Sequence, residues 1–177
     1  MKTSLSTFLL SVFIFITPVD VIAKEDAYSQ FFDQSWGNLP EELGNAREAG
    51  KQGLILFFEM DECPFCARMR ETFFTRKDVQ DYFKPRFLIL PIDIEGDTEL
   101  VDFTAKETTA KAFSQKNKVR ATPVIIFYDL EGKQLYRHTG PTKDAQEFIW
   151  MGQYIATGAY KNKQRFSQYR RAQRAKK

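Results

Sequence analysis

Three continuous apolar runs of strand length are the strongest pattern in the chain. They occupy residues 54–58, 87–92 and 124–128. A run without polar interruptions is typical of a strand buried on both faces, and we expect the first run to form the centre of a sheet. Glu131 and Gly132 follow the third run as a hairpin turn, which predicts a fourth, more exposed strand over 134–138.

Amphipathic stretches between these runs predict helices. The first helix begins with Leu39 and Pro40, carries acids in its first turn and ends before Gly50. The stretch 93–102 is polar and is predicted to be irregular. Further helices are expected over 67–75, from a cap at Asp78 onward, over 107–117 and over 143–156.

The resulting order is strand, helix, strand, helix, strand, strand, helix, with one extra helix in front. This order predicts an α/β fold with a central four-stranded sheet flanked by helices. Strands joined by a helical crossover are expected to be parallel, and the last pair, which has a short turn, is expected to be antiparallel. The sheet should therefore be mixed.

The amino terminus has the pattern of a secretory signal peptide. Lys2 precedes an apolar stretch over 5–17, Pro18 ends that stretch, and small or β-branched residues fill 21–23. The apolar stretch is shorter than the roughly 20 residues that a membrane span needs, and an uncleaved membrane anchor is the alternative. Cleavage of residues 1–23 would release a protein that acts outside the cytoplasm, where disulfides form. A bacterial periplasm is the simplest setting.

Composition indicates one folded domain over 24–160 and a distinct basic tail over 161–177. Apolar residues make up 43% of the 177 residues, and 17 Phe can supply a core. The tail has eight basic residues and no acid, whereas the domain has 17 basic and 22 acidic residues, a net charge of −5. We expect the tail to be a solvated helix whose start is held by Phe166 and Tyr169. Binding of nucleic acid or anionic lipid is the alternative, although nucleic acid is not an expected partner of a secreted protein.

Cys63 and Cys66 are the only cysteines, and their spacing indicates the chemistry. Two thiols three positions apart at a strand-to-helix junction form a reversible disulfide. The helix that begins here directs its free N–H groups at Cys63 and stabilises a thiolate, which is the attacking form. Pro64 fits the first turn because it has no N–H. Cys63 is therefore the predicted nucleophile, and Cys66 is the thiol that resolves the mixed disulfide.

Other uses of the cysteine pair fit the sequence less well. A count of two cysteines excludes a four-cysteine metal site and a framework of several disulfides. Only His138 and scattered carboxylates could complete a zinc site, and c-type haem needs His where Ala67 stands. A purely structural disulfide is the remaining alternative, but such a short ring removes little chain entropy. We predict no metal site.

The sequence Ala121-Thr122-Pro123 directly precedes the third apolar run. We expect this turn to lie beside the Cys63 loop, and we expect the Thr122–Pro123 bond to be cis because tight turns are the usual place for that isomer. The Thr122 backbone groups would then pair with an extended substrate, a form of strand addition. The alternative is an ordinary trans proline at the start of a strand.

These motifs together resemble the thioredoxin fold over residues 53–156. More narrowly, four segments are similar to the periplasmic thioredoxins of sulfur-oxidation systems, the SoxW-like group. The segments are Cys63 to Met69, the polar insert 93–103, residues 119–123 and residues 154–160. The resemblance implies that Cys63 is the nucleophile, Cys66 the resolving thiol and Pro123 the cis residue beside them. It also implies a soluble thiol–disulfide reductase that a membrane thiol donor recharges.

One position departs from ordinary thioredoxins. Those proteins have an Asp six residues before the first Cys, where Phe57 stands here. Glu59 is the candidate replacement, because partial burial would let its carboxylate accept the proton of Cys66. A solvated acid at the strand end is the alternative. Phe65 and Met60 could form an apolar docking surface beside the thiols or belong to the core.

We therefore expect a periplasmic thiol–disulfide oxidoreductase that uses no cofactor beyond the Cys63–Cys66 disulfide. It would act as a monomer and reduce disulfides of partner proteins or small molecules. The alternatives are a non-catalytic module that binds a peptide or carries sulfur, and a metal chaperone that uses both thiols. The expected substrate contacts are Pro64, Phe65, Thr122 and Pro123.

Overall fold

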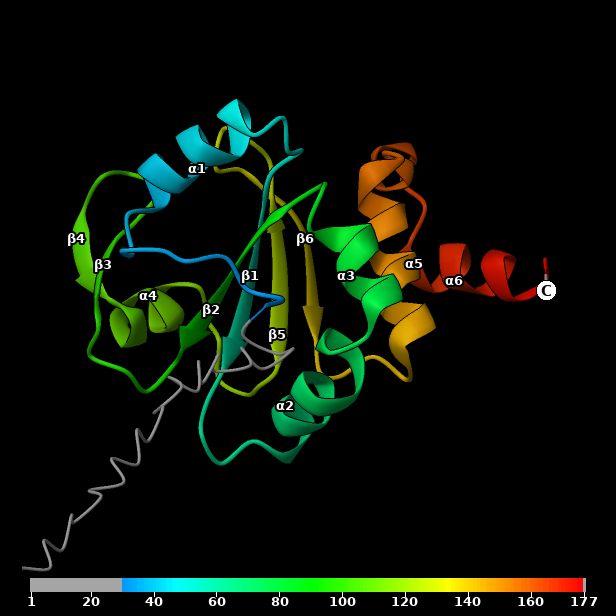
Figure 1. Ribbon diagram of the computed structural model, residues 1–177, viewed down its shortest axis with the longest axis horizontal. Helices are drawn as coiled ribbons and strands as arrows, with labels where there is room; N and C mark the ends of the chain where they lie inside the picture. Colours follow the sequence, from blue (N-terminus) through cyan, green and yellow to red (C-terminus); the bar gives the residue numbers. More distant parts are fainter. Residues whose placement is uncertain (1–29, 177) are drawn as a thin grey trace, which may run out of the picture.

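The computed structural model describes residues 30–176 (Figure 1). The predicted signal peptide over 1–23 lies outside the described residues. Within them, no helix has the length and apolar character needed to cross a membrane. The elements in chain order are α1 (Leu39–Glu48), β1 (Leu54–Glu59), α2 (Pro64–Met69) with a π-helical continuation (Arg70–Phe74), α3 (Lys77–Phe83), β2 (Leu88–Asp93), β3 (Glu99–Val101), β4 (Glu107–Thr109), α4 (Ala110–Lys116), β5 (Val124–Tyr128), β6 (Gln134–Thr139), α5 (Ala145–Ala156), a 3-10 turn (Ala159–Asn162) and α6 (Phe166–Arg174).

The main sheet has the strand order β2-β1-β5-β6, which confirms the predicted mixed four-stranded sheet of a thioredoxin fold. β1 is central and pairs in parallel with β2, with Leu54 opposite Leu88. β5 runs antiparallel to β1, with Val124 opposite Phe58, and β6 runs antiparallel to β5. The end of β1 and the start of β5 therefore lie at the same end of the sheet.

The expectation of parallel strands is wrong for the second helical crossover, from β2 to β5. β2 ends beside the end of β1, where Asp93 is opposite Glu59, and β5 begins at that same end. The connection between them consists of a second hairpin, formed by β3 and β4, and the seven-residue α4. Because it starts and finishes at the same end of the sheet, it does not carry the chain back to the other end as a parallel crossover must.

Alternating side chains of the strands fill two cores, one on each face of the sheet. In β1, Ile55 and Phe57 join the core under α3 and α5. Leu54, Leu56 and Phe58 join the core under α1 and α4, on the opposite face (Figure 1). All five side chains are at most 1% exposed. Burial on both faces explains why this strand has no polar positions before its last residue.

The polar stretch after β2 is not irregular, because part of it forms the β3–β4 hairpin. The two strands are short and pair antiparallel, with Glu99 opposite Thr109. The predicted helix over 107–117 therefore begins later, at Ala110. Thr109 caps it by accepting a hydrogen bond from an N–H of the first turn.

Asp102 holds the turn of this hairpin. Its buried carboxylate accepts hydrogen bonds from Lys116 Nζ and Thr104 Oγ1, each at 2.6 Å, and from the Thr104 N–H at 2.8 Å. These bonds, first of all the one from Lys116, hold the pKa of Asp102 well below its ordinary value. The hairpin is thereby tied to the end of α4.

We expect Asp102→Asn to lower the free energy of unfolding by about 1–2 kcal/mol at pH 7, because it weakens several hydrogen bonds to a buried acceptor. A carboxyl group with a lowered pKa in the folded protein stabilises the fold at pH values above its pKa in the unfolded chain, which is about 4. This stabilisation is lost as the pH falls from about 4 toward the folded-state pKa. The difference in free energy of unfolding between Asp102→Asn and wild type should therefore become smaller as the pH of the urea unfolding experiment is lowered below about 4. Asp97→Asn changes an exposed acid of the same segment, and an equal loss in both variants would contradict this role of Asp102.

Two predicted helix starts are also corrected. The cap of α3 is Arg76, and Asp78 lies inside the first turn, where its carboxylate pairs with Arg76 Nη2 at 2.8 Å. An acid in this position is favoured by the free N–H groups of the helix start. α2 begins at Pro64 rather than at 67, because proline is compatible with the first helical position.

β2 is an edge strand, and two features close its outer side. Asp33 donates its backbone N–H to the Ile89 carbonyl (2.9 Å), and its carboxylate accepts the Ile89 N–H (2.8 Å). Pro91 is the next residue whose backbone faces outward, and it has no N–H. The adjacent Phe31 and Phe32 are buried, so the segment before α1 is fixed along this edge.

The basic tail forms α6 and is bound to the domain. Phe166 is 6% exposed within the core and Tyr169 packs partly buried against it, as their spacing predicts. Glu147 of α5 is 2% exposed and accepts hydrogen bonds from Arg170 (2.5 Å) and Arg174 (2.9 Å). Much of α6 is exposed, as expected of a solvated helix, and the ion pairs to Glu147 hold it to the domain beyond its first turn as well.

Candidate active site

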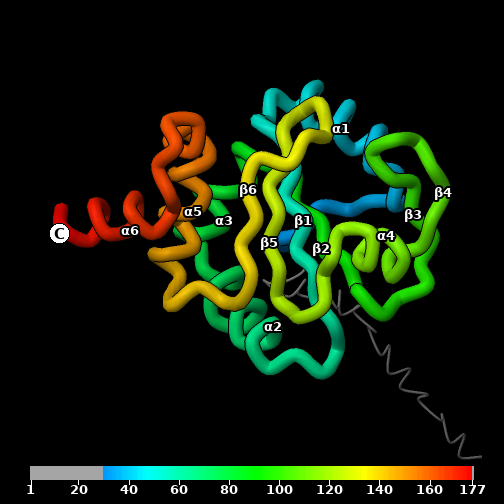
Figure 2. The backbone as a smooth tube through the Cα atoms, turned by 180° about the vertical axis from the view of Figure 1, so that it is seen from behind, coloured from blue at the N-terminus to red at the C-terminus, as the bar shows by residue number. Residues whose placement is uncertain are grey.

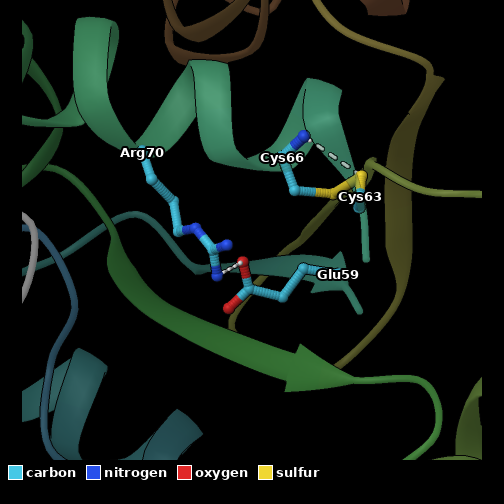
Figure 3. Close-up of a disulfide and its surroundings, with 4 residues drawn as sticks. All are labelled: Glu59, Cys63, Cys66 and Arg70. Carbon is cyan, nitrogen blue, oxygen red and sulfur yellow. Dashed lines mark hydrogen bonds and ion pairs between the residues drawn. A yellow bond between two sulfur atoms is a disulfide. The ribbon is translucent and has the colours of Figure 1, made fainter. Parts of the chain in front are cut away.

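β1 leads into a short loop, and α2 begins after that loop with both cysteines. Cys63 is the cap residue of α2, and Cys66 lies in its first turn. The two residues form a disulfide with their Cα atoms 5.2 Å apart (Figure 3). The pair thus occupies the strand-to-helix junction that the spacing predicts.

The two sulfur-bearing residues have different surroundings. Cys66 is completely buried, whereas Cys63 is 4% exposed and is followed by the exposed Pro64. The Cys66 N–H donates a hydrogen bond of 3.0 Å to Cys63 Sγ. In the reduced protein, the same N–H and the start of α2 would stabilise a thiolate at Cys63. Cys63 is therefore the less buried of the two residues, and its sulfur is the one that accepts a backbone hydrogen bond.

The residues between and before the cysteines differ in exposure. Phe65 is 52% exposed and presents free apolar surface next to the disulfide. Met60 packs partly buried against the core. Of the two candidate docking residues, Phe65 is the one whose side chain is exposed to solvent. Asp61 and Glu62 are exposed acids that precede Cys63 and oppose a thiolate there.

Thr122 and Pro123 lie at the same end of the sheet as the disulfide. Their peptide bond is cis, Pro123 is buried and Thr122 is half-buried. Pro123 directly precedes β5, whose first residue is opposite Phe58. Thr122 Oγ1 is buried and has no hydrogen-bond partner within residues 30–176. The strand pairing therefore brings this turn to the level at which β1 leads into the Cys63 loop.

Glu59 ends β1 and lies between that strand and the helix that carries the disulfide (Figure 3). Its side chain is 12% exposed, and its Oε2 lies 3.3 Å from Nη1 of Arg70. Glu59 also lines a cavity of about 550 Å³ between β2 and the segment before α1. The carboxylate is thus largely buried, paired with a cation and adjacent to space that water can enter.

Arg70 is a site residue that the sequence reasoning missed. It begins the π-helical continuation of α2 and reaches toward the end of β1 (Figure 3). Arg70 follows Cys66 by four positions, which is one helical turn on the same face. That spacing is the signal in the sequence that could have identified it. Phe57, which stands where ordinary thioredoxins have Asp, is 1% exposed and belongs to the core.

Metal-ligating side chains do not gather in the described part of the chain. No group of three or more His, Cys, Asp or Glu residues within it could hold a metal ion. His138, the one histidine, lies in β6 opposite Ile125 and so is separated from β1 by β5.

Comparison with known proteins identifies the thioredoxin-like domain family, which matches residues 39–156. No curated protein sequence matches the chain significantly. Among solved structures, a thioredoxin-fold protein from Helicobacter pylori is 19% identical with a TM-score of 0.62, over 84% of this chain and 92% of that protein. A putative disulphide isomerase from Bacteroides thetaiotaomicron is 25% identical with a TM-score of 0.53, over 72% of this chain and 91% of that one. A thioredoxin from Thermus thermophilus is 18% identical with a TM-score of 0.52, over 66% and 82%.

Proposed function

The chain belongs to the family of thioredoxin-like domains, and from this premise we propose that it is a thiol–disulfide oxidoreductase that reduces disulfides of partner proteins. The observation that carries the proposal is the hydrogen bond from the Cys66 N–H to Cys63 Sγ, at 3.0 Å, combined with the complete burial of Cys66. One sulfur is stabilised for exchange with a partner, and the other is accessible only to its neighbour.

Reduction begins with the thiolate of Cys63. It attacks one sulfur of the substrate disulfide, so that a bond between Cys63 and the substrate forms and the other substrate sulfur leaves as a thiolate. The Cys66 thiol then loses its proton and attacks Cys63 Sγ, which forms the Cys63–Cys66 disulfide and releases the second substrate sulfur with its electron pair. Two electrons pass from the dithiol to the substrate, and no cofactor beyond the two cysteines takes part.

The substrate is proposed to contact Pro64, Phe65, Thr122 and Pro123. The exposed ring of Phe65 supplies an apolar contact next to Cys63. The Thr122 turn is at the same end of the sheet. An extended substrate segment that crosses Cys63 would therefore come within reach of the Thr122 backbone groups, a mode of strand addition.

We further propose that the protein works in the periplasm and that a membrane thiol donor reduces it again after each turnover. The pattern of residues 1–23 supports the location. The reducing direction and the donor rest on the resemblance to the SoxW-like thioredoxins. A monomer suffices, because a single chain supplies both cysteines and the surfaces around them.

The direct test is reduction of the interchain disulfides of insulin, with dithiothreitol as the electron source. We expect the protein to accelerate the precipitation of free insulin chains well above the rate with dithiothreitol alone. A rate equal to that background, with Cys63 and Cys66 shown to be reduced, would reject the proposal.

Glu59 is proposed to accept the proton that Cys66 loses in the second step. Glu59→Gln keeps the size of the side chain but removes the acceptor. We expect release of substrate from the mixed disulfide to slow by about 100-fold, the order of a general-base contribution. Stopped-flow detection of the released substrate thiol measures this step.

The control for Glu59→Gln is Asp61→Asn, which removes an exposed acid two positions away. It should leave the release rate close to that of wild type. Alkylation of Cys63 as a function of pH provides a second measurement. Superposable alkylation curves and equal release rates in wild type and Glu59→Gln would end the proposal for this residue.

A further inference from the structure

A second cavity, whose lining includes neither cysteine, lies between β6 and the chain that follows α5. Its volume is about 570 Å³. In Figure 2, α5 and the start of α6 lie beside β6, the last strand of the sheet. Aromatic rings form its inner wall, among them Tyr136, Tyr154 and Phe166, whose ring centroids lie 5.4–5.9 Å apart. The wall is therefore rigid and well packed.

His138 lines this cavity and has a ring nitrogen without a hydrogen-bond partner in the described part of the chain. Its Nε2 is buried and has no hydrogen-bond partner within residues 30–176. The backbone carbonyl of Pro141 accepts a hydrogen bond from His138, so the nitrogen that donates is Nδ1. A buried polar atom without a partner is costly. A small rotation of the ring toward the cavity would let a ligand there give Nε2 a partner.

The rim of the cavity is basic. Lys163 and Arg165 line it and are exposed. Arg170 also lines it and shares the single carboxylate of Glu147 with Arg174. Because two guanidinium groups compete for one carboxylate, this cluster keeps a net positive charge. No acidic residue lines the cavity.

We propose that this cavity binds a tetrahedral oxyanion, such as a sulfate or a phosphate group. Lys163 and Arg165 attract the anion, and the guanidinium of Arg170 contributes charge from the inner side. His138 takes up a proton at Nε2 and donates it as a hydrogen bond to an anion oxygen. The site is separate from the cysteines, and the proposal stands whether or not the protein reduces disulfides.

Protonation of His138 links binding to pH. Burial lowers the pKa of His138, and the hydrogen bond to Pro141 opposes that effect. The imidazole is therefore neutral at pH 7, and an anion that favours the protonated form must bind more tightly as the pH falls. The charged and titratable groups around the ring come from β6, α5, the chain after α5 and α6, while Ile125 of β5 is apolar. They are Tyr136, Glu147, Tyr154, Tyr160, Lys163, Arg165 and Arg170.

The first test uses the wild-type protein and needs no substitution. The chain has one histidine, so a single imidazole proton resonance in the NMR spectrum reports its titration. Sulfate is the probe because it remains a dianion between pH 5 and 8. Saturating sulfate is expected to raise the pKa of His138 by about one pH unit relative to chloride at equal ionic strength, and linkage then requires about tenfold tighter binding to the protonated form. An unchanged titration curve would overturn the proposal.

Matched variants distinguish specific binding in the cavity from non-specific attraction of sulfate to basic residues. Arg165→Gln is expected to weaken sulfate binding by about fivefold or more in calorimetry, because a charge-assisted contact is lost. Arg171→Gln removes the same charge from an exposed position of α6 outside the cavity lining and should leave affinity nearly unchanged. His138→Gln should remove the pH dependence of affinity. Equal losses in the two arginine variants would overturn the proposal in favour of non-specific attraction.

A last arm distinguishes the source of the oxyanion. Binding of the protein to phosphatidylglycerol vesicles is measured by sedimentation, with and without free inorganic phosphate. Vesicle binding that phosphate and Arg165→Gln both abolish identifies a lipid headgroup as the ligand. Sulfate binding without vesicle binding identifies a free oxyanion. Vesicle binding that Arg165→Gln and Arg171→Gln weaken equally counts against the cavity as the site.

Discussion

Replacing Cys66 with serine is expected to convert the protein into a covalent trap for its substrates. Cys63 can still attack a substrate disulfide, but no buried thiol remains to resolve the mixed disulfide. A neighbouring thiol in the same molecule acts at an effective concentration far above that of millimolar added reductant, so turnover should fall by at least about 100-fold. Non-reducing gels followed by mass spectrometry would show partners attached at Cys63.

The matched variant is Cys63→Ser, which should lose both turnover and trapping. The reason is the asymmetry of the pair, since Cys66 is completely buried and Cys63 receives the stabilising N–H. Trapping by Cys63→Ser at the level of Cys66→Ser would reverse the proposed roles. If Cys66→Ser traps no partner while the wild-type protein reduces insulin, the natural substrates are restricted to small disulfides.

Phe74→Ala is expected to cause the largest loss of stability among single substitutions considered for this fold. The ring is fully buried, stacks on Phe31 at 4.3 Å and meets Phe57 edge-on at 5.0 Å. Truncation of such a ring leaves a cavity and lowers the free energy of unfolding by about 3–5 kcal/mol. Urea unfolding followed by tryptophan fluorescence and circular dichroism measures the loss.

Phe65→Ala is the natural control for this substitution. It removes the same side chain nine positions away, but from a site that is 52% exposed. Its effect on the free energy of unfolding should stay within about 0.5 kcal/mol, while insulin reduction should slow if the ring contacts substrate. A loss below about 1 kcal/mol for Phe74→Ala would mean that the surrounding rings collapse into the vacated space.

The central strands could be located from the sequence because they are buried on both faces. A strand such as β1 excludes polar side chains along its length, and this leaves an unmistakable apolar run. β3 and β4 could not be found in this way. Each has three residues, Glu99 and Glu107 are exposed, and Leu100 is the one buried position. Such strands form because Asp102 fixes the turn between them, which is a tertiary effect.

The helix starts show which local signals were decisive. Thr109 satisfies an N–H of α4 through its side chain, whereas the earlier residues of the predicted helix pair with β3. Asp78 is a residue type that often caps helices but lies two positions after the cap of α3, because Arg76 already supplies the extended residue before the helix. Residues that favour both caps and first turns leave the start uncertain by one or two positions.

The candidate site was more predictable than its supporting residues. The spacing of Cys63 and Cys66 and the Thr122-Pro123 pair are local sequence features. The partner of Glu59 depends on how α2 is laid over the end of β1, and Arg70 could be found only by considering the helical face. The burial of Glu147 had no local signal, because its two arginine partners lie 23 and 27 positions later in the chain.

The closed outer side of β2 has a consequence for how copies of this protein behave at high concentration. An uncovered edge strand is a template on which another chain can assemble, and this is a common route to aggregation and domain swapping. Here the outward N–H and carbonyl of Ile89 are both hydrogen-bonded to Asp33, and Pro91 has no N–H to donate. Another chain could pair with this edge only after displacing the segment around Asp33. The two hydrogen bonds between Asp33 and Ile89 therefore protect the protein against intermolecular sheet formation at β2.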